Sequence, residues 1–134
     1  MQPILTVDLS KEEIGELLIS DEWVSMYLGG ATLAARLLYD FLTPALDPLS
    51  PQSPLLFING PLSGTAGPAV GRFVVCGKSP ATRLWAESHC GGFWGPELRK
   101  AGCDGILIIG RAKKPVFLWV NGSTSRGLEV EIRS

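Results

Sequence analysis

The order of apolar and polar residues along the chain predicts a series of short strands. Apolar and polar positions alternate in ILTVDLS (residues 4–10), which is typical of a strand with one face on a core. LLFIN (55–59) and GILIIG (105–110) are continuous apolar runs, as expected for strands buried on both faces. Four further segments have strand-like patterns: RFVVCG (72–77), RLWAE (83–87), PVFLWV (115–120) and LEVEIR (128–133). The connections RAKKP (111–115) and NGSTSRG (121–127) are predicted to join hairpins.

Three other segments have the pattern of helices. SDEWVSMYL (20–28) begins with Ser20 or Asp21 as a plausible N-cap and carries acids in its first turn. ATLAARLLYDFL (31–42) has 3.6-residue periodicity and is predicted to pack on a sheet. Its apolar face is formed by Leu33, Ala34, Leu37, Leu38 and Phe41. The third helix lies within GGFWGPELRKAG (91–102), with Pro96 near its start and Gly102 just past its end.

These elements favour one α+β domain over residues 1–134. About seven strands and about three helices come in runs rather than in strand–helix alternation, so a mostly antiparallel sheet is expected. Hydrophobic residues make up 46% of the chain, which is enough to bury a core. Proline-rich (43–54) and glycine- and proline-rich (60–71) segments are expected to be loops.

Charge is distributed unevenly along the chain. Residues 1–53 hold eight acids and two bases, whereas residues 54–134 hold ten bases and five acids. The second half is therefore suited to facing an anion, or it simply carries ordinary surface charge. The bases are too scattered for a nucleic-acid platform. No apolar run is long enough to span a bilayer and no secretory signal is present, so we expect a cytoplasmic protein that does not bind a membrane.

The single histidine and the three cysteines do not form a recognisable reactive motif. Cys76, Cys90 and Cys103 are widely spaced, which argues against disulfides and against a zinc or iron–sulfur site in this chain. We expect three small, reduced and mostly buried thiols. His89 adjoins Cys90, and neighbours on a strand point to opposite faces, which disfavours a nucleophile–base pair and a metal site built from their side chains.

Two glycine-rich loops are the better candidates for a binding site. Gly91 and Gly92 precede a helix, where free amides and the helix dipole favour an anion and a missing Cβ permits close approach. The same glycines also suit a tight turn that binds nothing. The loop from Gly60 to Gly71 matches no nucleotide-binding pattern, but it leads into Arg72. That arginine can pair with a phosphate or a polar heterocycle, or with a surface acid.

The chain also resembles a known family. Phrases in the same order as in that family are YLGG, AARLLYD, DPLSP, FINGPLSGT, GRFVVCGKSP, GGFWGPELRKAGCDGILIIGRAKKPVFLWV and VEIR. They span the chain from about Leu5 to Arg133, and they are similar to the N-terminal domain of the tungsten-dependent aldehyde ferredoxin oxidoreductases. Several adjoining motifs in register make this resemblance more specific than any single glycine pattern.

The resemblance implies two mostly antiparallel β-sheets with about three short helices, which together form the base for a tungsten bis-pterin cofactor. A magnesium ion bridges the pterin phosphates in that family. By position, Arg72 corresponds to an arginine that contacts the pterin, and Gly91 to a glycine whose backbone lies against it. His89 corresponds to an asparagine whose main-chain carbonyl binds magnesium. Cys90 stands at a small intervening residue, usually serine.

The sequence departs from the family pattern at three places. An imidazole replaces the usual amide at His89, and Ala31 in GGAT replaces an arginine that the family often has. KSPATRLWAE (78–87) departs from the usual K-S-P-L-T-G continuation. These changes bear on the fine contacts to the cofactor.

Family members continue into helical domains that hold a 4Fe–4S cluster and the acid–base residues. The chain is therefore expected to serve a tungsten enzyme that oxidises aldehydes to carboxylic acids and reduces ferredoxin, and to be inactive without those domains or a separate catalytic subunit. The alternative is a non-enzymatic module, orphan or small subunit, that forms a homo-oligomer or docks to a catalytic chain. A third possibility is a phosphate-ligand binder unrelated to tungsten.

Overall fold

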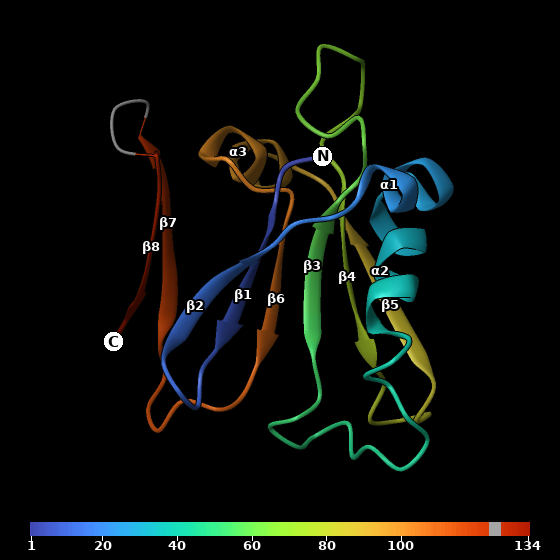
Figure 1. The fold of residues 1–134 in the computed structure, drawn as a ribbon, viewed down its shortest axis with the longest axis vertical. Coiled ribbons are helices and arrows are strands. Elements are labelled where there is room, and N and C mark those ends of the chain that lie inside the picture. The colour runs from blue at the N-terminus through green and yellow to red at the C-terminus, as the bar shows by residue number, and fades with distance from the viewer. Residues whose placement is uncertain (124–126) are drawn as a thin grey trace.

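The computed structural model describes residues 1–123 and 127–134. Its main element is a six-stranded sheet of order β2-β1-β6-β3-β4-β5 (Figure 1). The bounds are β1 Ile4–Asp8, β2 Glu13–Leu17, β3 Leu55–Asn59, β4 Phe73–Lys78, β5 Trp85–Cys90 and β6 Gly105–Ile109. Only the β1–β6 pair is parallel. β7 (Phe117–Ser123) and β8 (Gly127–Arg133) form a separate antiparallel pair.

Within residues 1–123 and 127–134, the helices are three, and they lie around the sheet (Figure 1). They are α1 (Asp21–Tyr27), α2 (Gly30–Leu38) and α3 (Trp94–Ala101). The predicted N-cap of α1 is confirmed, because Ser20 accepts a hydrogen bond from the Trp23 amide at 3.3 Å. Gly102 ends α3 in the left-handed conformation, as the sequence predicted. None of the helices within the described residues is long and apolar enough to cross a membrane.

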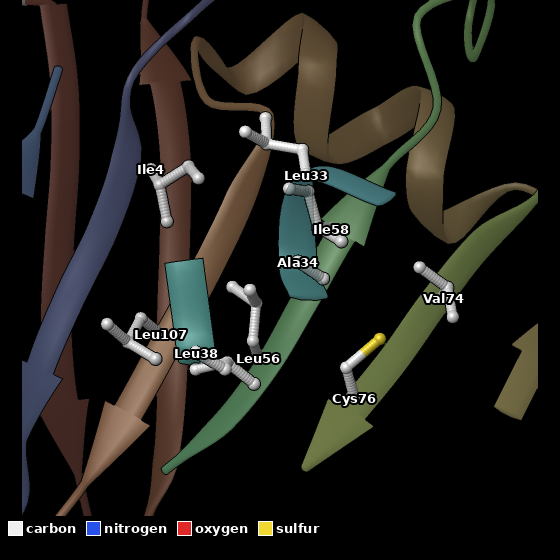
Figure 2. Packing of buried hydrophobic residues seen from close by; sticks show 9 residues of the cluster. All are labelled: Ile4, Leu33, Ala34, Leu38, Leu56, Ile58, Val74, Cys76 and Leu107. Atoms are coloured by element: carbon white, nitrogen blue, oxygen red, sulfur yellow. The ribbon is translucent and has the colours of Figure 1, made fainter. Parts of the chain in front are cut away.

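The six-stranded sheet has an apolar core on each face. On one face, α2 packs over β1, β6, β3 and β4 (Figure 2). This cluster consists of Ile4, Leu33, Ala34, Leu38, Leu56, Ile58, Val74, Cys76 and Leu107. On the other face, Leu5 and Val7 of β1 pack with α3 and with β7 and β8. Each fully buried Leu, Ile or Val stabilises the fold by about 1.5–3 kcal/mol, so the two clusters account for the layering.

The α+β class and the two mostly antiparallel sheets are confirmed, but several details differ from the sequence prediction. β2 was not predicted, because its EIGEL sequence is polar and almost wholly exposed at the sheet edge. RAKKP is not a hairpin join, since β6 and β7 belong to different sheets. The α2 helix ends at Leu38, so Phe41 is half exposed and does not extend the helix face.

The other predicted hairpin is β7–β8. Its antiparallel pairing is confirmed, from Phe117 opposite Arg133 to Ser123 opposite Gly127. The remaining residues of the predicted turn, 124–126, lie outside the described residues.

A buried lysine holds the proline-rich loop at one end of the sheet. Lys78, at the end of β4, donates hydrogen bonds to the carbonyls of Thr43, Pro44 and Leu46 at 2.8, 3.0 and 2.7 Å. The opposite end of the sheet carries the loop of residues 60–71 and α3 (Figure 1). One end is thus closed by a lysine brace, and the other presents the glycine-rich segments.

Candidate cofactor-binding site

Pairing of β4 with β5 brings Arg72 and Gly91 to the same edge. Phe73 begins β4 and lies opposite Cys90, the last residue of β5. The residue before β4 and the residue after β5 are therefore neighbours, although they lie far apart in the sequence. The 60–71 loop and the 91–93 bend leave the sheet together at this point.

A cavity of about 540 Å³ lies between these two segments. Its walls come from the 60–71 loop, the 91–93 bend and α3, and its lining consists of Gly64, Thr65, Gly67, Ala69, Val70, Gly71, Arg72, Gly91, Gly92, Phe93, Pro96 and Lys100. Of the four predicted site residues, Arg72 and Gly91 line this cavity. His89 and Cys90 lie directly before it in β5 but are not part of its lining.

Several glycines around the cavity allow the 60–71 loop to pack tightly on residues 92–96. A Cβ atom on Gly71 would lie 2.6 Å from the Gly92 carbonyl oxygen, and one on Gly95 would lie 2.6 Å from Asn59 Oδ1. Gly64 has a φ of 75° and packs on Pro96. Neither backbone could come so close with a side chain in place.

The two glycines of the bend differ from these packing glycines. Added Cβ atoms on Gly91 and Gly92 would meet nothing within 4 Å. Their backbone therefore faces open space beside the cavity. A flat ligand could approach it closely.

The charged side chains that line the cavity are both cationic. Arg72 is exposed, and no carboxylate of the described residues lies within 4.0 Å of its guanidinium. Lys100 is paired with Glu97 at 2.6 Å. No carboxylate lines the cavity itself, within the part of the chain that the structure describes. The arrangement suits an anionic or oxygen-rich ligand, which Arg72 can bind through charge-assisted hydrogen bonds.

His89 and Cys90 do not form a reactive pair. His89 lies opposite Val74, a member of the α2-side core, while Cys90 lies opposite Phe73 on the other face. The His89 Nε2 atom lies 3.3 Å from Glu87 Oε1, and the Trp85 indole donates to Glu87 Oε2 at 3.0 Å. The hydrogen bond from Trp85, followed by that from His89, lowers the pKa of Glu87.

The thiols differ in exposure. Cys76 and Cys103 are buried and Cys90 is exposed, so the expectation of mostly buried thiols holds for two of the three. Burial, with a smaller contribution from nearby carboxylates, raises the pKa of Cys76 and that of Cys103 to about 12. Among residues 1–123 and 127–134, no group of three or more His, Cys, Asp or Glu side chains is placed to hold a metal.

Several site residues were not found from the sequence. Lys100 and Phe93 line the cavity because α3 is turned toward it, which no local pattern reveals. Arg99, which is 21% exposed, forms a hydrogen-bond network behind the cavity with the buried Asp104 and Asn59. The only signal of Asn59 and Asp104 was a polar residue in otherwise apolar surroundings, and Arg99 had no such signal. Trp94 packs on Phe57 and Phe73 but remains 41% exposed.

The chain is similar to known proteins over nearly its whole length. Residues 4–134 match the family described as "Aldehyde ferredoxin oxidoreductase, N-terminal domain". The chain is 38% identical over 130 residues to a tungsten-containing aldehyde ferredoxin oxidoreductase of Pyrococcus horikoshii, covering 97% of this chain and 21% of that protein. It is 35% identical to the aliphatic sulfonate oxidoreductase, WOR-like subunit, of Pyrococcus furiosus, covering 97% of this chain and 20% of that protein.

A solved structure is similar over almost the whole chain. It is the active-site complex BamBC of benzoyl coenzyme A reductase with 1,5-dienoyl-CoA, with a TM-score of 0.93 and 38% identity. The match covers 99% of this chain and 20% of that one. The chain therefore spans about one fifth of the length of these relatives.

Proposed function

The chain belongs to the aldehyde ferredoxin oxidoreductase family, as its N-terminal domain, and from this premise we propose that it forms the base on which a tungsten bis-pterin cofactor rests. The domain binds and orients the cofactor as part of a larger oxidoreductase. The remaining domains, or a separate catalytic subunit, complete the active site.

The observation that carries the proposal is the cavity beside Arg72 and the open Gly91–Gly92 backbone. A pterin is flat and rich in hydrogen-bonding atoms, and its side chain carries a phosphate. The open glycine backbone suits the ring, and a guanidinium that has no acidic partner among the described residues suits oxygen acceptors. The residues of the cavity fit the group.

The residues at the site have distinct proposed roles. The Arg72 guanidinium donates hydrogen bonds to the pterin, and the Gly91 backbone lies against its ring. The main-chain carbonyl of His89 is a proposed magnesium ligand, and this role does not depend on its side chain. Cys90 separates these two positions in the extended chain. When bound, the tungsten–pterin group supplies the redox chemistry, while this domain supplies binding and orientation.

The proposed reaction of the whole enzyme is oxidation of an aldehyde to a carboxylic acid, with electrons passing through a 4Fe–4S cluster in other domains to ferredoxin. The aldehyde assignment follows the relatives named for that activity. Relatives named for aliphatic sulfonates and for benzoyl coenzyme A are similarly close. The cofactor base is therefore proposed as the shared feature, and the substrate is chosen outside this domain.

An equilibrium binding experiment with Arg72→Gln tests the proposal. The probe is a fluorescent 6-substituted pterin that carries a phosphate, and its anisotropy is measured with the 134-residue chain. Loss of a charge-assisted pair worth about 1–3 kcal/mol should weaken binding about 5- to 150-fold.

The matched control is Arg83→Gln, in the turn between β4 and β5 at the opposite end of the same strands. It should bind the probe like the unchanged chain. Absence of pterin binding, or equal affinity of the Arg72→Gln variant, would contradict the proposal. Equal affinity for inorganic phosphate and for the pterin phosphate would favour a simple phosphate binder instead.

A further inference from the structure

We propose that Arg99 is a positioning residue that sets the distance between the two walls of the cavity. We call this side chain the Arg99 brace. Its contribution to cofactor binding rests on the proposed function, but its effect on the loop can be tested without any ligand. Arg99 lies on α3, behind the cavity, and is not part of its lining.

The guanidinium of Arg99 joins α3 to the start of the glycine-rich loop. Its Nη1 atom donates to the carbonyls of Pro61 and Ser63 at 2.8 and 2.7 Å, and Nη2 donates to that of Gly60 at 3.2 Å. These three carbonyls lie directly before the cavity-lining residues of the loop. One side chain thus connects both walls.

A buried carboxylate holds this guanidinium in one orientation. Arg99 Nε donates to Asp104 Oδ1 at 2.6 Å, and the Asp104 side chain is 2% exposed. The other carboxylate oxygen accepts from the Gln2 amide at 2.9 Å, and the backbone carbonyl of Asp104 accepts from Asn59 at 2.8 Å. The brace is therefore anchored beside β3 and β6 in the sheet. A lysine could keep the charge but could not reproduce the planar fork of donors.

The 60–71 loop and the start of α3, which the Arg99 brace joins, lie close together. Asn59 Nδ2 donates to the Gly95 carbonyl at 2.9 Å, on the N-terminal turn of α3. The close approaches at Gly71 and Gly95 leave no room for a methyl group between the loop and the 91–93 bend, or between the loop and the first turn of the helix. A loop held this tightly is already formed before a ligand arrives, which lowers the entropic cost of binding.

Amide hydrogen exchange of the ligand-free Arg99→Lys variant tests the inference. The amides of Ser63, Gly64 and Thr65 donate to carbonyls within the loop, so they report its order. We expect their exchange to accelerate about tenfold or more, because the loop can then open without breaking the hydrogen bonds from the Arg99 guanidinium to its carbonyls. The amides of Leu9 and Gly110, at the other end of the sheet, should change less than about twofold.

Arg111→Lys is the matched control. Arg111 Nη2 also donates to a loop carbonyl, that of Leu49 at 2.9 Å, at the proline-rich end. This variant should leave the exchange of Ser63, Gly64 and Thr65 unchanged. Asp104→Asn is a second test, because it removes the charge behind Arg99 at almost constant shape and should accelerate the same three amides.

Unchanged loop exchange in Arg99→Lys would overturn the inference. A uniform acceleration of amide exchange over all strands in both Arg99→Lys and Asp104→Asn would also overturn it, since Arg99 would then stabilise the whole fold rather than the loop. A pterin phosphate that fails to bind the unchanged chain would refute the proposed function but not the brace. Pterin binding with unaffected loop exchange in the variants would refute the brace alone.

Discussion

Gly91 and Gly95 are four residues apart and serve opposite purposes. A Cβ atom on Gly95 would meet Asn59 Oδ1 at 2.6 Å and Ser63 Oγ at 3.0 Å, so the absence of a side chain there permits packing. At Gly91 a Cβ atom would meet nothing within 4 Å. The fold therefore leaves room for a side chain at position 91, which supports the proposed contact of this backbone with a ligand.

Gly91→Ala should separate binding from folding. The free energy of unfolding should change by less than about 0.5 kcal/mol, because the new methyl group has space. Pterin phosphate affinity should fall about tenfold or more, because the methyl group displaces the ring from the backbone. Urea unfolding and fluorescence anisotropy measure the two quantities.

Two other glycines provide controls for this variant. Gly60→Ala also adds a methyl group to open space, but outside the cavity lining, and should preserve both stability and affinity. Gly95→Ala should lower stability by about 1–3 kcal/mol through overpacking. A Gly91→Ala variant with undiminished affinity would argue against contact between this backbone and the ligand.

Thiol reactivity gives a further prediction. At pH 8 iodoacetamide should alkylate Cys90 rapidly, because it is exposed, and spare the two buried thiols. The pKa of Cys76 and that of Cys103 are raised to about 12, so their reactive thiolate forms are scarce at this pH. Peptide mass spectrometry locates the label, and Cys90→Ser should abolish rapid labelling. Equal labelling of all three cysteines in the folded chain would contradict the burial.

At the scale of elements, a basic side chain that binds three loop carbonyls holds a loop at each end of the six-stranded sheet. Lys78 holds the proline-rich loop, and Arg99 holds the glycine-rich loop. Both loops lack regular hydrogen-bond ladders, so these side chains satisfy carbonyls that would otherwise depend on solvent. Removal of either brace should loosen its own loop first.

Lys78→Met tests the brace at the proline-rich end. Methionine keeps the apolar stem of the side chain as far as the ε position but lacks the ammonium group, so three carbonyls are left without their donor. We expect a loss of about 2–3 kcal/mol in the free energy of unfolding. The exposed Lys11→Met variant, which removes only ion pairs at 3.7 and 3.9 Å, should cost less than about 0.5 kcal/mol. Equal losses in the two variants, measured by urea unfolding, would show that the three carbonyl bonds do not stabilise the loop.

The sequence predicted the elements whose residues carry a clear apolar period. β3 and β6 were predicted from continuous apolar runs and β1 from its alternating pattern, although β1 also buries residues on both faces. β2 was missed because it pairs through its backbone and exposes its glutamates to solvent. No local feature of the sequence indicates that β6 and β7 belong to different sheets. The prediction that the segment between them joins a hairpin was therefore wrong.

The candidate site was predictable to a similar extent. Glycine patterns and Arg72 marked two loops, and the resemblance suggested their ligand. The register of β4 against β5, which places Arg72 beside Gly91, depends on pairing that no single segment specifies. The Arg99 brace depends on side-chain contacts with backbone carbonyls 36 to 39 residues away, which have no pattern in the sequence.

At the scale of the whole molecule, the segments of the proposed binding site gather at one end of the sheet. The 60–71 loop, the 91–93 bend and α3 meet there (Figure 1). The proline-rich loop that Lys78 holds lies at the other end. The part of the chain that the structure describes supplies cations and bare backbone at the cavity, but no carboxylate or imidazole in its lining. This composition suits a base that holds a cofactor while other parts of a larger enzyme act on the substrate.

The most direct test is a hydrogen–deuterium exchange footprint of the chain with and without the tungsten–pterin cofactor, released anaerobically from a tungsten-containing aldehyde ferredoxin oxidoreductase. We predict that protection is concentrated in residues 64–72 and 91–93, and that the turn around Arg83 is unaffected. Protection confined to other segments, or no protection at saturating cofactor, would contradict the account.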